Sequence, residues 1–187
     1  MSVEEKMRKL ELHEINKKRI SPDKISHAKR LPVYVLLDNI RSLYNVGSIF
    51  RTADAARVEK LILTGITGRP PRKEIDKTAL GASETVPWEY DPSAIDALKH
   101  LKKQGIPIII LEHTDSNVEY GKMDFPFPCC LVLGNEVSGI QEEILGLADA
   151  CIEIPMFGTK HSLNVSVAFG IVIYEILQQF LRNNEIM

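Results

Sequence analysis

Ile154-Pro155-Met156-Phe157-Gly158-Thr159-Lys160-His161-Ser162-Leu163-Asn164-Val165 connects a strand-like run, Cys151 to Ile154, with the last helix of the chain. That helix extends to about Leu181 and is apolar on every side through its first ten residues or so. A helix that is apolar all round must be buried all round. Its entrance nevertheless carries Ser162 and Asn164, whose polar groups need hydrogen-bond partners if they are buried. We therefore expect a buried C-terminal helix with a functional site at its entrance.

The length and composition indicate an ordinary globular protein. A chain of 187 residues predicts one main domain with a sizeable core, and 44% hydrophobic with 26% charged residues is the usual globular balance. The net charge of −2 does not by itself indicate a nucleic-acid binder. Residues 1–30, however, hold nine Lys or Arg against five acidic residues, a net +4 that leaves −6 for the remainder. We predict that residues 1–30 form a basic helical extension and that residues 31–187 form the main domain.

The basic extension has two possible roles. Residues 3–18 have a helical pattern because Val3, Met7 and Leu10 share one face, and Ser21-Pro22 would end the helix. The extension either contacts nucleic acid or packs as a solvated helix on the edge of the domain. The sequence leaves both interpretations open.

The cysteines and the ends of the chain bear on metals and on the cellular compartment. Cys129, Cys130 and Cys151 are odd in number, and adjacent strand residues point to opposite faces, so the first two cannot easily share a metal. We expect reduced core cysteines, no metal site and a cytoplasmic location. The charged start is unlike a signal peptide. The apolar centre of the last helix is too short for a membrane span and is interrupted by Glu175, so we expect no membrane association.

Apolar runs alternate with helical patterns along the chain. Strands are predicted at residues 33–37, 61–63, 107–111, 130–133 and 151–154, with an extended segment at 85–90. Helices are predicted at residues 45–57, 78–82, 93–104 and 139–147, the second ended by Gly81, the third capped by Ser93 and the last by a capping box from Ser138 to Gln141. This order predicts an α/β fold with a mostly parallel sheet of five or six strands and helices on both faces.

Polar residues follow four of the predicted strands, after Leu37, Leu111, Leu133 and Ile154. In such folds ligands bind beyond the carboxyl ends of the strands. Asn45 is predicted to cap the helix at 45–57, whose apolar stripe faces the core. Arg51 falls nearly opposite that stripe and therefore points to solvent, to a ligand or to a second subunit.

Several common chemistries lack their sequence signatures. No GxGxxG follows the first strand, and no GxxxxGK[ST] occurs, so a dinucleotide fold and a P-loop are both disfavoured. A triad of Ser162, His161 and Glu136 is disfavoured because no GxSxG elbow is present. What remains are polar residues near strand ends, with Gly134 as a point where a ligand could approach the backbone closely: Asn45, Arg51, Asn135, Glu136, Ser162 and Asn164.

Three of these segments carry a family resemblance. Asn45 to Ala55 (NVGSIFRTADA), Leu131 to Ile140 (LVLGNEVSGI) and Ile154 to Ala168 (IPM followed by SLNVSVA) resemble the three motifs of the SpoU (TrmH-type) RNA methyltransferases of the SPOUT superfamily. The motifs occur in the family order and at family-like separations. The resemblance covers about residues 33–180 and is specific as a set.

The resemblance implies a fold, a cofactor and a site. It implies a SPOUT-type α/β domain with a C-terminal deep trefoil knot that holds S-adenosylmethionine, and a homodimer that methylates a ribose 2′-hydroxyl in tRNA or rRNA. The cofactor-binding residues would be Leu111, Gly134, Asn135, Ile154, Met156, Ser162 and Leu163. The catalytic residues would be Asn45, Arg51, Glu136, Ser162 and Asn164.

Individual roles follow from the same resemblance. Arg51 matches an arginine that reaches the partner's cofactor, and it would act either as a base or by orienting the hydroxyl and a phosphate. A carboxylate such as Glu136 would favour the cationic sulfur electrostatically. Many relatives carry an extra N-terminal RNA-binding domain, where this chain has about thirty residues before its first strand. A non-catalytic RNA-binding relative and an unrelated α/β nucleotide-binding protein are the alternatives.

Overall fold

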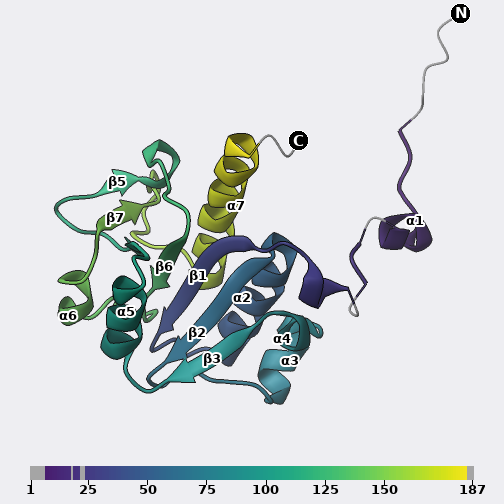
Figure 1. Ribbon diagram of the computed structural model, residues 1–187. Coiled ribbons are helices and arrows are strands. Elements are labelled where there is room, and N and C mark those ends of the chain that lie inside the picture. The colour runs from purple at the N-terminus through teal and green to yellow at the C-terminus, as the bar shows by residue number, and fades with distance from the viewer. Residues whose placement is uncertain (1–6, 18, 22–23, 185–187) are drawn as a thin grey trace, which may run out of the picture.

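The computed structural model describes residues 7–17, 19–21 and 24–184. Its centre is a seven-stranded parallel sheet in the order β3-β2-β1-β6-β4-β7-β5 (Figure 1). The predicted parallel α/β sheet is therefore confirmed, and β5 is a short edge strand that the sequence analysis did not identify. The strands are β1 (Leu31–Asp38), β2 (Val58–Thr64), β3 (Trp88–Asp91), β4 (Ile108–Leu111), β5 (Val118–Glu119), β6 (Cys129–Leu133) and β7 (Ala150–Glu153).

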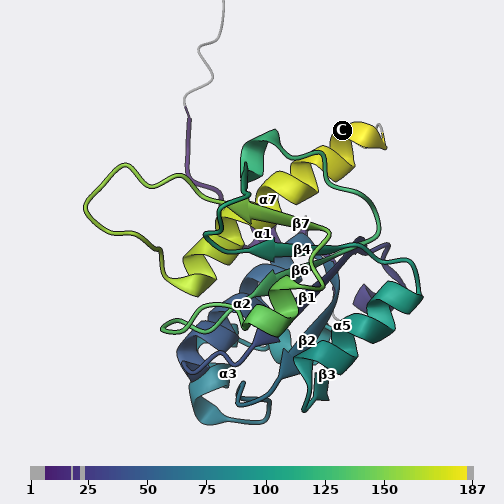
Figure 2. The ribbon, with the colours of Figure 1, turned by 90° about the vertical axis from the view of Figure 1, so that its left-hand side faces the viewer.

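Helices cover both faces of the sheet, as predicted (Figure 2). One apolar layer includes buried residues of α2, α3, α4 and α7, and the other includes those of α5 and α6. The helices are α1 (Leu12–Lys17), α2 (Leu43–Ala56), α3 (Lys73–Ala79), α4 (Ala82–Thr85), α5 (Ala94–Lys103), α6 (Glu142–Leu145) and α7 (Val165–Asn183), with short 3-10 turns η1 (Ile25–His27) and η2 (Tyr120–Lys122).

The adjacent cysteines of β6 belong to different layers. Cys129 lies in the layer of α2 and α7, whereas Cys130 lies in the layer of α5 and α6. Burial raises the pKa of the Cys129 thiol to about 12. Burial, with the neighbouring Cys129 thiol, also raises the pKa of Cys130. Both therefore act as apolar core residues.

Two helix starts differ from the predictions. Ser42, not Asn45, caps α2, because its hydroxyl accepts the Asn45 backbone N–H at 3.3 Å. The helix predicted from Gly139 is reduced to α6, and Ser138 forms no capping box. There the backbones of Asn135 and Gly139 pair instead, with N···O distances of 3.2 and 3.0 Å. By contrast, Ser93 caps α5 as predicted.

The helix predicted at residues 78–82 is displaced. Helix α3 occupies Lys73–Ala79 and ends at Leu80, which adopts a left-handed conformation with φ of 51°. Gly81 does not end this helix, since it precedes the short α4 with φ of 88°. The turn-rich sequence before Lys73 concealed the start of α3, whose apolar face consists of Ile75 and Ala79.

Helix α7 is not buried all round within one chain. Its buried residues, Phe169, Val172, Ile173 and Ile176, form a single face. On another face Val167 is 51% and Tyr174 45% exposed. The helix has 19 residues and a mean hydropathy of 1.3, so by length and composition it could span a membrane, contrary to the prediction that it is too short. Core helices of folded domains meet the same criteria, and here α7 packs against α2.

The N-terminal extension is only partly helical in the described residues. Residues 7–11 are not helical, α1 covers only Leu12–Lys17, and the predicted contribution of Val3 lies outside the described residues. No residue of α1 is buried, and Figure 1 shows this helix away from the sheet. Arg30 joins the extension to the domain, donating to the carbonyl oxygens of Val58 at 3.3 Å and Thr85 at 3.1 Å.

Candidate functional site

A pocket of about 790 Å³ lies beyond the carboxyl ends of β1, β4, β6 and β7. Its volume is within the range of about 300–1,000 Å³ usual for small-molecule sites. Arg51 is absent from its lining, but every other predicted site residue contributes: Asn45, Leu111, Gly134, Asn135, Glu136, Ile154, Met156, Ser162, Leu163 and Asn164. The fold thus brings together residues from all four polar runs.

Glu136 connects the loop after β6 to the start of α2. Its carboxylate accepts the backbone N–H groups of Arg41 at 2.9 Å and Ser42 at 3.1 Å, and the Asn45 side-chain amide at 2.9 Å. Burial alone would raise the pKa of Glu136, but these donors outweigh it and lower the pKa below its usual value. Glu136 is therefore a stable anion at the N-terminal end of α2, where a negative charge is favoured.

Asn45 extends this connection to α7. Its side-chain oxygen accepts the amide of Asn164 at 3.0 Å. The Asn164 oxygen in turn accepts the Ser166 backbone N–H at 2.9 Å, which caps α7. The chain Glu136–Asn45–Asn164 thus joins all three motif segments through side chains. The Ser162 hydroxyl, by contrast, is exposed and has no hydrogen-bond partner within the described residues.

The turn after β6 is built by Gly134 and Asn135. The Asn135 oxygen accepts the backbone N–H groups of Val137 at 2.9 Å and Ser138 at 3.0 Å, and its amide donates to the Asn39 carbonyl at 2.7 Å. A Cβ at Gly134 would lie 2.7 Å from the Gly139 carbonyl carbon. A glycine is therefore needed at position 134 because the protein's own backbone, rather than a ligand, passes close to it.

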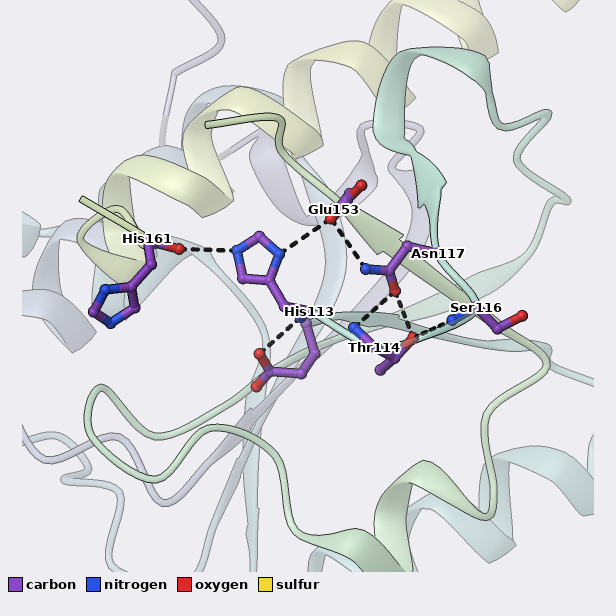
Figure 3. A network of polar contacts seen from close by, with 7 residues as sticks. His113, Thr114, Ser116, Asn117, Glu153 and His161 are labelled. Atoms are coloured by element: carbon purple, nitrogen blue, oxygen red, sulfur yellow. Dashed lines mark hydrogen bonds and ion pairs between the residues drawn. The ribbon is translucent and has the colours of Figure 1, made fainter. Parts of the chain in front are cut away.

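Some pocket residues were not predicted from the sequence as part of the site, among them Arg41, Glu112, His113 and Glu153. His113 contacts Glu153 and the His161 carbonyl oxygen (Figure 3). Glu112 accepts the Ile140 backbone N–H at 3.0 Å. The position of Glu112 and His113 just after β4 is a signal in the sequence that they belong to the site. Their hydrogen-bond partners are distant in sequence, however, so these contacts were not predictable.

Arg51 lies apart from the pocket of its own chain. It is on the exposed side of α2, as its helical position predicted, while Val46, Ile49, Phe50 and Ala53 are buried. Its guanidinium makes no hydrogen bond or ion pair with the part of the chain that the structure describes. Within one chain Arg51 therefore does not line the pocket that contains Ser162 and Asn164.

Comparison with known proteins shows which family shares this architecture. Residues 32–174 match the model of the SpoU rRNA Methylase family. A tRNA (guanosine(18)-2′-O)-methyltransferase of Escherichia coli K12 is 34% identical over 167 residues, which are 86% of this chain and 72% of that protein. The crystal structure of the TrmH/SpoU tRNA modifying enzyme of Aquifex aeolicus superposes with a TM-score of 0.79 at 30% identity, covering 94% of this chain and 86% of that one.

A third similar protein was solved with its cofactor. The AdoMet-bound rRNA methyltransferase of Sinorhizobium meliloti has a TM-score of 0.75 at 30% identity, and the match covers 82% of this chain and 61% of that one. The parallel sheet, the pocket at its strand ends and these similarities define an α/β methyltransferase. The chain belongs to the SpoU methylase family.

The pocket fits S-adenosylmethionine, the cofactor of this family. Leu111, Ile154 and Met156 provide apolar surface for a nucleoside. The carboxylates of Glu112 and Glu153 suit a cationic sulfur and an amino group, since opposite charges attract more strongly in a partly enclosed site. Among the described residues, no group of three His, Cys, Asp or Glu side chains could hold a metal ion.

Proposed function

We propose that this protein transfers a methyl group from S-adenosylmethionine to a ribose 2′-hydroxyl in tRNA or rRNA, as a cytoplasmic homodimer. The main observation behind the proposal is that Glu136, Asn45 and Asn164 line one pocket. There the hydrogen bonds between their side chains join the three motif segments. Its relatives support this acceptor, since they are named as 2′-O-methyltransferases of tRNA or rRNA or as an rRNA methyltransferase.

The exposed side of α7 supports the homodimer. Val167 and Tyr174 are seven positions apart, so they lie on the same side of the helix, where both are exposed. Exposed apolar surface of this kind favours association with another chain. We propose that a two-fold dimer through this face brings Arg51 of one subunit to the pocket of its partner.

When bound, S-adenosylmethionine supplies an electrophilic methyl group on a positively charged sulfur. In the proposed mechanism, Glu136, Asn45 and Asn164 fix the strand-end loops so that cofactor and acceptor are aligned, and alignment supplies much of the rate. Arg51 orients the 2′-hydroxyl and a neighbouring phosphate, because a guanidinium stays protonated and donates in a planar fork. Ser162, at the entrance of α7, offers a free hydroxyl to the acceptor.

Radiolabelled methyl transfer to bulk tRNA and rRNA tests the activity. We expect incorporation that survives alkaline hydrolysis as 2′-O-methylated dinucleotides. Arg51→Ala should lower kcat by at least about a hundredfold, the cost of losing an oriented donor, and leave cofactor affinity unchanged. Binding of RNA without any transfer would favour the non-catalytic alternative, and full transfer by Arg51→Ala would refute the role of Arg51.

Mixed dimers test whether Arg51 serves the partner. Arg51→Ala and Asn164→Ala chains are each expected to be inactive alone. In a mixed dimer, the intact pocket of the first chain receives Arg51 from the second. Random mixing should then restore about a quarter of the wild-type sites. If Arg51 served its own pocket, mixing would restore none.

A further inference from the structure

His113 bridges three segments at the edge of the cofactor pocket. It follows β4, its Nδ1 lies 3.1 Å from Glu153 Oε2, and its Nε2 lies 2.9 Å from the carbonyl oxygen of His161 (Figure 3). Glu153 ends β7, and His161 precedes Ser162 in the loop between β7 and α7. One imidazole ring therefore ties β4 and β7 to the loop that walls the pocket.

Both partners of the ring can only accept hydrogen bonds. A backbone carbonyl oxygen and an ionised carboxylate have no hydrogen to donate. A neutral imidazole has one N–H, so it satisfies one partner and sets a nitrogen lone pair against the other oxygen. An imidazolium donates to both. His113 therefore lies between two acceptors, one facing each ring nitrogen, and can bridge them.

The groups around His113 are themselves held in place. Glu153 is fixed by the Asn117 side-chain amide, which donates to the same carboxylate oxygen at 3.0 Å. Glu112 accepts the His113 backbone N–H at 2.8 Å, which fixes the backbone beside the ring. On the loop the charged or titratable groups are Lys160 and His161, and Arg41 and Glu136 line the same pocket. His113 therefore connects the loop to a fixed part of the site.

We propose that His113 is a positioning residue that holds the loop of residues 154–164 against the cofactor pocket, so that affinity for S-adenosylmethionine falls when its ring is replaced. The inference rests on the proposed function, because the ligand is that cofactor. Its physical basis is the bond to His161, which neighbours the pocket residues Ser162 and Leu163. A side chain that cannot reach both oxygens would leave the loop less firmly held.

Calorimetry with S-adenosylmethionine tests the proposal. We expect His113→Gln to bind the cofactor about two- to five-fold more weakly than wild type, as for the loss of partly exposed polar contacts. Equal affinity of the two proteins would overturn the proposal.

Two further histidine variants identify the responsible ring. His161→Gln keeps the backbone carbonyl that His113 contacts, so its loop should be protected from amide hydrogen exchange as in wild type. His100→Gln, exposed on α5, should behave as wild type. Loss of this protection in His161→Gln would overturn the proposal.

Amide hydrogen exchange of residues 157–163 provides a readout that needs no cofactor. The wild-type loop should be more protected than that of His113→Gln. Equal protection would overturn the proposal even if the cofactor binds. Failure of wild type to bind S-adenosylmethionine, with the protection difference present, would instead count against the proposed function alone.

Discussion

Replacing Glu136 by glutamine tests the contact that joins the loop after β6 to α2. The amide oxygen of a glutamine can keep the bonds to the Ser42 N–H and the Asn45 amide, which share one carboxylate oxygen. Its NH₂ group then faces the Arg41 N–H, which the other carboxylate oxygen accepts at 2.9 Å. The substitution thus places two donors against each other and removes the negative charge at the start of α2.

The expected cost follows from these contacts. A hydrogen bond to a charged group contributes about 1.5–3 kcal/mol, and a charge at a helix N-terminus about 0.3–1 kcal/mol. Because the Glu136 side chain is exposed, we expect the low end of this range, about 1–2 kcal/mol of unfolding free energy. For a chain of this size that lowers Tm by about 2–8 °C. Cofactor affinity should fall as well, since the pocket wall is loosened.

Thermal and urea unfolding as a function of pH are the assays. The pKa of Glu136 is lowered in the folded state, so its stabilisation is present above the ordinary pKa of 4.5 and is lost as the pH falls through the folded value. The gap between wild type and Glu136→Gln should therefore close in acid. Glu143→Gln, also in the first turn of a helix and exposed, is the control and should stay within about 0.5 kcal/mol of wild type. Equal stability of the two variants at neutral pH would refute the reasoning.

Two further changes test the core and the extension. Phe169→Ala removes a side chain with 0% exposure and should lower the unfolding free energy by about 3–5 kcal/mol in urea titrations, whereas Lys99→Ala on the exposed side of α5 should cost little. Deleting residues 1–24 removes basic residues but keeps Arg30, so RNA binding should weaken about two- to ten-fold at low salt, with cofactor affinity unchanged. Unaltered RNA affinity after that deletion would favour a purely solvated extension.

Much of the architecture was predictable because it depends on short-range patterns. The apolar runs of β1 and β6 are buried on both faces, and the stripe of α2 that includes Val46 and Phe50 is buried as predicted. Ser93 caps α5 because a cap acts only on the next turn. Where two polar residues competed for one cap, the prediction was wrong: Asn45 has a cap-forming side chain, but it bonds to Glu136 and Asn164 instead.

Many residues that line the pocket were also predictable as a set, since the three motif segments follow strand ends and resemble one family. The sequence by itself therefore determined the parallel α/β fold, the family and ten of the pocket residues, because periodicity, caps and motifs are local properties of the chain. Only the tertiary structure determined how they meet. Asn45 bonds to residues 91 and 119 positions away, and His113 to a carbonyl 48 positions away. Hydrogen bonds depend on distances in space, which the folded sheet sets and the order of residues does not.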